Sequence, residues 1–207
     1  MICTCPAATS LKDITAVACP ENFGQIQKIA FQRLVASGVK NAFTSVSDIK
    51  LLASWTALKS AADSTKVIVS PYVNAPTTEA GEARTFGGGN ETLGGIEEIL
   101  GSNPTSFSAV LRKMPAATIR DLKALMCEDG NLGVFLFDEN GAIGAIQDAS
   151  VATTFYPIPI RAFFVGDKSL GGFEAPDSNV ISWQFLPDWS DYLVKVAPTD
   201  FNPLTDL

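Results

Sequence analysis

The chain contains no histidine among its 207 residues. Ser-His-Asp and Cys-His catalytic arrangements, and ordinary histidine metal sites, therefore cannot form within it. Charged residues are also scarce at 18%, whereas hydrophobic residues reach 46% and the mean hydropathy is +0.19. Because this hydropathy is high for a protein that stays soluble alone, we expect part of the apolar surface to meet a partner.

An excess of positive charge is absent as well. The net charge is −7 and the sequence pI is about 4.6, so a basic face that grips nucleic acid is not supported. No stretch approaches the roughly 18 apolar residues of a membrane helix. The start MICTCP lacks the basic residues and apolar run of a secretory signal. We therefore expect no membrane anchor.

Cysteine is rare, with four residues at Cys3, Cys5, Cys19 and Cys127. A zinc site requires two closely spaced pairs, and only the first two cysteines are close, at an unfavourable spacing. In a reducing cytoplasm, such cysteines do not keep disulfides. We therefore expect the four cysteines to have no functional role and to bind no metal. No cofactor is expected either, because the triple glycine 87–89 lacks the Lys-Ser/Thr ending of a phosphate loop.

The most informative stretch is the glycine- and threonine-rich run within residues 74–105. Six glycines in residues 75–95 supply backbone freedom, and two isolated apolar side chains there have few local neighbours. Such a segment exposes apolar surface on a monomer. We interpret it as an arm that contacts a neighbouring subunit, and the residues expected at that contact are Thr77, Thr78, Arg84, Phe86 and Leu93.

Hydrophobic periodicity predicts two helices and roughly seven strands. A helix face formed by Leu51, Trp55, Leu58 and Ala62 follows a plausible cap at Ser47, and a second helix runs from residue 115 to about 128–130. Residues 96–100 fit either a short helical turn or a bent strand. Strands are expected at residues 26–34, 66–73, 107–113, 132–137, 142–146, 156–165, 180–186 and 192–196, with an Asn-Gly turn at residues 140–141.

These elements predict an α+β fold that is mainly antiparallel β-sheet, with one or two helices packed on it. Residues 66–73 and 107–113 are expected to form the stem of a long hairpin whose tip is elaborated. We find no strong domain boundary. The chain is therefore expected to form a single domain, 1–207, with an extended N-terminal arm at 1–22 and a long loop or arm at 74–105.

Two further patterns in the sequence bear on catalytic or binding chemistry. Acidic pairs such as Glu97 and Glu98 could serve glycoside hydrolysis, but acids that flank turns are usually solvated. Trp183 is expected in the core. Trp189 stands near two aspartates, and it fits an aromatic plug at a subunit or sheet corner better than a sugar-stacking surface. We therefore expect no enzyme, with a carbohydrate-binding module or hydrolase as the alternative from another class.

The glycine/threonine arm and the strand-turn run VISWQF…PDWSD (180–191), in a β-rich chain with a packed helix, resemble tail-tube proteins of tailed bacteriophages. The runs CPENFGQIQKIAFQR (19–33) and GEARTFGGGN (81–90) look like virion proteins of phages that infect gut Bacteroides. The resemblance covers about two thirds of the chain. The two N-terminal cysteines and the unpatterned first 22 residues depart from it.

The resemblance implies a β-sandwich or barrel subunit with a flanking helix, six copies of which close a ring, with rings stacked into a hollow tail tube. Its partners would be further copies of itself, other tail proteins and passing DNA that is not specifically bound, and its location would be the virion, after assembly in the host cytoplasm. A connector or terminator ring, a capsid-decorating protein and the inner tube of a contractile system are related alternatives. An acidic channel wall avoids binding to sliding DNA, and the candidates to line the lumen are Asp138, Glu139 and Asp148.

Overall fold

The computed structural model describes residue 14 and residues 22–207. Chain contacts divide it into two compact units. The larger unit, called the body, comprises residues 23–81 and 104–207. Residues 82–103 belong to the other unit and are called the arm. The expected N-terminal arm at 1–22 and three of the four cysteines lie outside the described residues, apart from Ile14 and Asn22.

The body is built on one ten-stranded sheet in which all recorded strand pairs are antiparallel. The main path runs β11-β10-β9-β12-β13-β8-β5, with β1 pairing β9 and β4, and β14 pairing β10. This confirms the predicted α+β class, with more strands than expected. The strands are β1 (Ile26–Arg33), β4 (Val67–Val69), β5 (Asn74–Glu79), β8 (Thr105–Arg112), β9 (Leu132–Asp138), β10 (Ile143–Gln147), β11 (Phe155–Tyr156), β12 (Ile158–Val165), β13 (Ser178–Phe185) and β14 (Leu193–Val196). A separate small hairpin joins β2 (Val35–Ala36) to β3 (Val39–Lys40).

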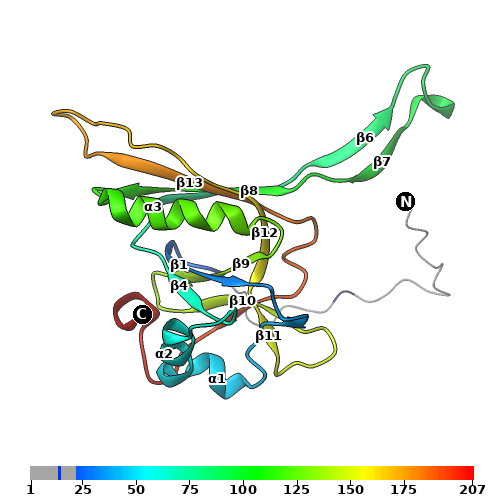
Figure 1. Ribbon diagram of the computed structural model, residues 1–207. Coiled ribbons are helices and arrows are strands. Elements are labelled where there is room, and N and C mark those ends of the chain that lie inside the picture. Colours follow the sequence, from blue (N-terminus) through cyan, green and yellow to red (C-terminus); the bar gives the residue numbers. More distant parts are fainter. Residues whose placement is uncertain (1–13, 15–21) are drawn as a thin grey trace. The chain divides into compact units, whose positions relative to one another are not determined.

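The sheet changes direction along β12, which divides it into two leaves (Figure 1). Only Ile158 and Pro159 of β12 pair with β9, whereas residues 160–165 pair with β13. The β13 leaf therefore has the order β12-β13-β8-β5, and the β9 leaf contains β1, β4, β9, β10, β11 and β14. Apolar side chains from both leaves form one core, which includes Phe31, Val134, Phe107 and Trp183. The result is a sandwich-like body.

Strand β9 is buried on both of its faces, which explains its continuous apolar sequence LGVFLFD. Val134 and Leu136 point into the core between the leaves, while Phe135 and Phe137 alternate onto a second core. The second core lies between the β9 leaf and the short helices α1 (Val46–Lys50), α2 (Leu52–Ser60) and α4 (Pro203–Asp206). In Figure 1, α1 and α2 lie on the side of β9 opposite α3.

Trp55 anchors the second core, as the sequence predicted. Its side chain is fully buried, packs edge-on against Phe135 and Phe137, and donates from Nε1 to the carbonyl of Ile49 at 2.9 Å. The single helix expected from residue 47 is divided, however, because Leu51 is extended. The cap is also Ser45 rather than Ser47, since the Ser45 side chain accepts a hydrogen bond from the Ser47 N–H.

Helix α3 (Ala116–Ala124) confirms the second predicted helix and continues as a 3-10 turn, η2 (Leu125–Glu128). Pro115 serves as its N-cap. Ile119 and Leu122 are buried in the core between the leaves, so the helix packs on the sheet as expected. Figure 1 shows α3 alongside the β13 leaf.

The predicted stem of the long hairpin was wrong in one strand. Val67–Val69 forms β4, which pairs with β1, and the partner of β8 is the following strand β5. Pro71 separates the two, and the Ser70 N–H donates to the Ile29 carbonyl at 2.7 Å, which holds the end of β4 on β1. The β9–β10 hairpin is confirmed, with Gly141 at a φ of 76° in its turn.

Candidate assembly surface

The arm is a two-stranded hairpin of β6 (Ala83–Gly87) and β7 (Glu97–Ser102). Of the two structures expected for residues 96–100, the strand is the one formed, since residues 97–100 belong to β7. The pairing of β6 with β7 is irregular, because its register shifts between Arg84 and Thr85. A 3-10 turn, η1 (Leu93–Gly95), forms part of the tip. In sequence, the arm is inserted between β5 and β8.

Thr92 organises the tip of the arm. Its hydroxyl accepts a hydrogen bond from the Gly88 N–H at 3.0 Å and donates to the Ile96 carbonyl at 2.6 Å. Gly87 has a φ of 93°, and a Cβ there would lie 2.0 Å from Cγ2 of Thr92. Only glycine fits this position. Sequence reasoning missed Thr92, although a threonine between two glycine clusters is a typical turn residue.

The arm exposes apolar side chains on both of its faces. Thr85 pairs directly with Ile99, and Phe86 pairs with Glu98, so these two pairs point to opposite sides of the hairpin. A hairpin of two strands is marginally stable alone. The exposed fractions are 53% for Phe86, 100% for Leu93, 72% for Ile96, 74% for Ile99 and 62% for Leu100.

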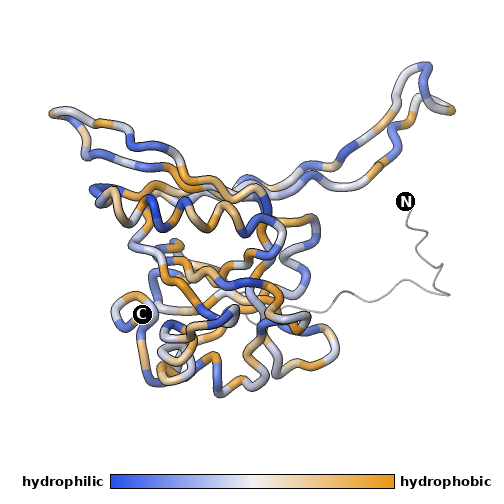
Figure 2. Tube along the Cα trace, viewed as in Figure 1, coloured by the Kyte–Doolittle hydropathy of each residue, from blue (hydrophilic) through white to orange (hydrophobic). Residues whose placement is uncertain are grey.

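The arm therefore has no core of its own within the described chain. Figure 2 shows hydrophobic and hydrophilic residues mixed along both of its strands. Arg84 is also exposed, close to Gly101 on the partner strand. The expected contact residues Arg84, Phe86 and Leu93 are thus available to a partner, and Ile99 and Leu100 extend the same surface.

Thr77 and Thr78 lie outside the arm, on β5 at one edge of the β13 leaf. Both are exposed, and the hydroxyl of Thr77 shares a 2.8 Å hydrogen bond with that of Ser108. Among the described residues, β5 pairs only with β8, so its other edge is open. The two threonines therefore mark a free strand edge.

The opposite edge of this leaf belongs to β12. Over residues 160–165, no strand of the described chain pairs with β12 on the side away from β13. At the bulge in this strand the N–H of Ala162, which has a φ of 53°, donates to the Asp129 carboxylate at 3.0 Å. The leaf thus has on each side an edge that pairs with no other strand of the described chain, while the η2 segment next to Asp129 lies against part of the β12 edge.

Asp138 must be removed from the lumen candidates. Its side chain is fully buried and forms an ion pair with Lys195 at 2.7 Å. It also accepts hydrogen bonds from the N–H groups of Gly24 at 3.3 Å, Asn140 at 3.0 Å and Ala142 at 2.8 Å. A carboxylate that is enclosed in a single chain cannot line a channel between chains.

The other two lumen candidates differ from each other. Glu139 is exposed in the β9–β10 turn. Asp148 is half-buried and organises its own loop, because it accepts from the N–H groups of Ser150 and Val151 and from the hydroxyl of Tyr156. These hydrogen bonds lower the pKa of Asp148 below its ordinary value. That Glu139 and Asp148 line a channel stays a prediction.

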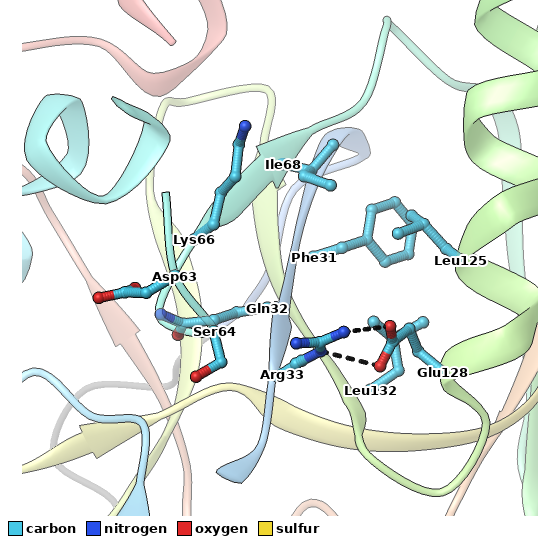
Figure 3. A pocket seen from close by; sticks show the side chains of 10 residues that line it. All are labelled: Phe31, Gln32, Arg33, Asp63, Ser64, Lys66, Ile68, Leu125, Glu128 and Leu132. Atoms are coloured by element: carbon cyan, nitrogen blue, oxygen red, sulfur yellow. Dashed lines mark hydrogen bonds and ion pairs between the residues drawn. The ribbon is translucent and has the colours of Figure 1, made fainter. Parts of the chain in front are cut away.

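A hollow of about 190 Å³ lies beside β1 and β4, and Figure 3 shows the side chains that line it. Arg33 extends across it to Glu128, with a hydrogen bond of 2.8 Å from Nε to Oε2. This bond lowers the pKa of Glu128. Asp63 accepts from the backbone and hydroxyl of Thr65, and its pKa is lowered as well. The hydrogen bonds thus favour the ionised form of both Asp63 and Glu128. A catalytic general acid has a raised pKa instead, so neither carboxyl group fits that role.

Trp183 and Trp189 both pack against other aromatic rings of the body. Trp183 is buried between the leaves and stacks on Phe107 at 4.1 Å. Trp189 is half-buried and stacks on Phe185, with ring centroids 4.2 Å apart and planes 14° apart. One face of Trp189 is therefore already covered, which favours a corner plug over a sugar platform.

Within the described part of the chain, no group of three or more His, Cys, Asp or Glu residues could hold a metal ion. Cys127 is exposed and unbonded. The other three cysteines lie outside the described residues. None of the helices in the described residues is both long and apolar enough to cross a membrane.

No protein-family model and no curated protein matches the chain. Among solved structures, the chain is similar to one in the tail of an empty gene transfer agent particle with C6 symmetry, at 16% identity and a TM-score of 0.34, covering 60% of this chain and 82% of that one. A chain in the virion of the native gene transfer agent matches at 16% and 0.33, covering 60% and 85%. A chain of the six-fold symmetrised anti-feeding prophage baseplate matches at 10% and 0.34, covering 87% and 98%. At these TM-scores and identities the likeness carries no argument about function.

Proposed function

We propose that this protein is a structural subunit of a phage-like tail, and that its copies close into rings which stack into a hollow tube for DNA passage. The observation that carries the proposal is the β13 leaf, which has four antiparallel strands and an open edge on each side. An open edge presents unpaired N–H and C=O groups, and closure between copies removes it.

The strand directions in this leaf suit a ring. In an antiparallel leaf with an even number of strands, the first and last strands run in opposite directions. When copies are arranged head to tail, β5 of one copy therefore meets β12 of the next as an antiparallel pair. Such heterologous contacts close into a ring when the rotation between copies permits it. In this arrangement Thr77 and Thr78 lie at the seam between copies.

The arm supplies the second contact. A hairpin without a core gains stability when its apolar side chains are covered, and exposed apolar residues on both faces fit insertion between two surfaces better than docking on one. We assign Phe86 and Leu93 as the anchors of a contact with a neighbouring copy in the same or the next ring.

Passage of DNA requires a wall that does not bind it. Tight binding to DNA requires clustered lysine or arginine facing the phosphates, and this chain has a net charge of −7. The protein is located in the virion tail, with other tail proteins as further partners and without a catalytic role.

Negative-stain microscopy of the purified protein at high concentration tests the proposal. We expect rings, of six copies as the resemblance implies, together with stacked tubes. Replacing the arm, residues 82–103, with a short glycine-serine turn should leave a folded subunit that does not form tubes.

Phe86→Ala should weaken assembly by about 2 kcal/mol per contact. Phe173→Ala, which changes a fully exposed phenylalanine outside the arm, is the matched control. A monomeric mass at high micromolar concentration, or normal tubes from the arm deletion, would refute the assignment.

A further inference from the structure

The part of the β12 edge that a second strand could use is short, because the chain already covers the rest. The first two residues of β12 pair with β9. At the bulge that follows, the N–H of Ala162 donates to the Asp129 carboxylate at 3.0 Å, and the Ile160 carbonyl accepts from Nη1 of Arg161 at 3.4 Å. Bulges and charged side chains of this kind protect a strand edge from pairing. The usable part of the edge therefore begins after residue 162.

The hydrogen bonds of the leaf determine which backbone groups face this part of the edge. Opposite residues of an antiparallel pair alternate between hydrogen-bonded and non-hydrogen-bonded positions. The Gly166 N–H donates to the Val180 carbonyl of β13 at 2.8 Å, so Gly166 directs its backbone groups toward β13. Val165, one position earlier and opposite Ile181, therefore directs its N–H and C=O toward the open edge.

The same alternation identifies the matching residue on β5. The Lys113 N–H donates to the Asp177 carbonyl at 2.9 Å, so the odd-numbered residues of β8 face β13 and the even-numbered residues face β5. Thr77, opposite an even-numbered residue of β8, therefore bonds β8, and Thr78 faces the open edge. Pro76 has no N–H to offer. Thr78 thus presents both an N–H and a C=O to a neighbouring strand.

We propose that Thr78 of one copy and Val165 of the next copy form a hydrogen-bonded pair, which sets the register of the seam between copies. This register places Glu79 opposite Phe164. The side-chain faces agree, because Thr78 and Val165 lie on the core face of the leaf while Glu79 and Phe164 lie on its outer face. The inference rests on the contact between β5 and β12 proposed above and specifies its register.

The neighbouring registers are unfavourable. A register must shift by two residues to keep the side-chain faces matched. A shift toward the bulge puts Glu79 opposite Ala162, where the Asp129 carboxylate already occupies the N–H, and so brings two carboxylates together. A shift the other way puts Thr78 opposite Asp167, which lies beyond the end of β12 and forms an ion pair with a lysine of α3.

Disulfide cross-linking tests the register in the full-length chain, with its four native cysteines replaced by serine. The added pair is Glu79→Cys with Phe164→Cys. In the proposed register these positions form a non-hydrogen-bonded pair with Cα atoms about 4.5 Å apart, within the range of a disulfide. Within one copy they lie on opposite edge strands of the leaf, about 14 Å apart or more, so they cannot bridge there. We expect a ladder of covalent oligomers on a non-reducing gel, which reductant removes.

The matched control is Thr77→Cys with Phe164→Cys, which uses the same strand and the same face. Its Cα atoms would lie about 8 Å apart across the seam, too far for a disulfide. A ladder from the control, or rings in the microscope without a ladder from the Glu79→Cys and Phe164→Cys chain, would reject the register while the ring stands. Covalent oligomers of that chain without rings would support the seam and refute the closed tube. The absence of both rings and cross-links would reject both proposals.

Discussion

Replacement of Asp138 by alanine should destabilise the body more than any change to an exposed carboxylate. The buried Asp138 side chain receives three backbone N–H groups and the Lys195 ammonium at 2.7 Å. It ties the start of β1, through Gly24, to the β9–β10 turn. The substitution leaves those donors without an acceptor and removes the Asp138 carboxylate from Lys195, whose side chain is 24% exposed.

The expected cost is about 3 kcal/mol, at the lower end of the range for breaking a buried pair, because Lys195 retains partial access to water. For a chain of this size, that corresponds to a fall in the thermal midpoint of roughly 6–12 °C. Differential scanning calorimetry measures it, with Glu139→Gln as the neighbouring control, which should change stability by about 0.5 kcal/mol or less. If Asp138→Ala unfolds within a degree of Glu139→Gln, the buried pair does not hold the turn.

The same pair predicts an acid-sensitive stability. Burial alone raises the pKa of Asp138, but the bonds from Lys195, Ala142 and Gly24 outweigh it, and the pKa is lowered. A lowered folded-state pKa contributes stability that is present above the ordinary aspartate pKa of about 3.9 and is lost as the pH falls through the folded value. Urea titrations of the wild type between pH 7 and pH 3 should show this loss, and Asp138→Asn should show less of it.

The remaining predictions concern the core, the tip of the arm, a surface pair and DNA. Trp55→Ala should cost about 3–5 kcal/mol in denaturant unfolding, because a fully buried indole with three ring contacts is removed. Gly87→Ala should reduce tube formation without lowering the melting midpoint of the body, because its Cβ would collide with Thr92. Glu128→Gln should leave the thermal midpoint near that of the wild type, since exposed pairs contribute little. Assembled tubes should not bind DNA at low salt in a gel-shift assay, and tight salt-sensitive binding would favour a DNA-gripping connector.

The elements that sequence predicted well are those specified by neighbouring residues. Helix α3 and the β9–β10 hairpin follow from apolar spacing and from the Asn140-Gly141 turn, where the glycine takes the positive φ. The exposure of Phe86 and Leu93 was predictable for the same reason. A glycine-rich stretch contains too few apolar side chains to bury its own.

Pairing between distant strands was not predictable from local patterns. The β-branched run of β4 looks like the first half of the hairpin that ends in β8, yet β4 lies on β1 and the polar strand β5 takes its place. Nothing in residues 66–79 distinguishes these pairings, because both depend on residues 27 or more positions away. The open edges of β5 and β12 follow from this pairing and so became visible only in the structure.

Asp138 illustrates the same limit for charge. In the sequence it is an acidic residue before a turn, indistinguishable from its neighbour Glu139. The structure separates them, since Lys195 reaches Asp138 from β14 while Glu139 remains exposed. The net charge of −7 therefore does not say which carboxylates lie on the surface, because a buried aspartate counts toward it just as an exposed one does. Any acidic channel wall must be built from carboxylates that remain exposed after folding, and Glu139 rather than Asp138 meets that condition.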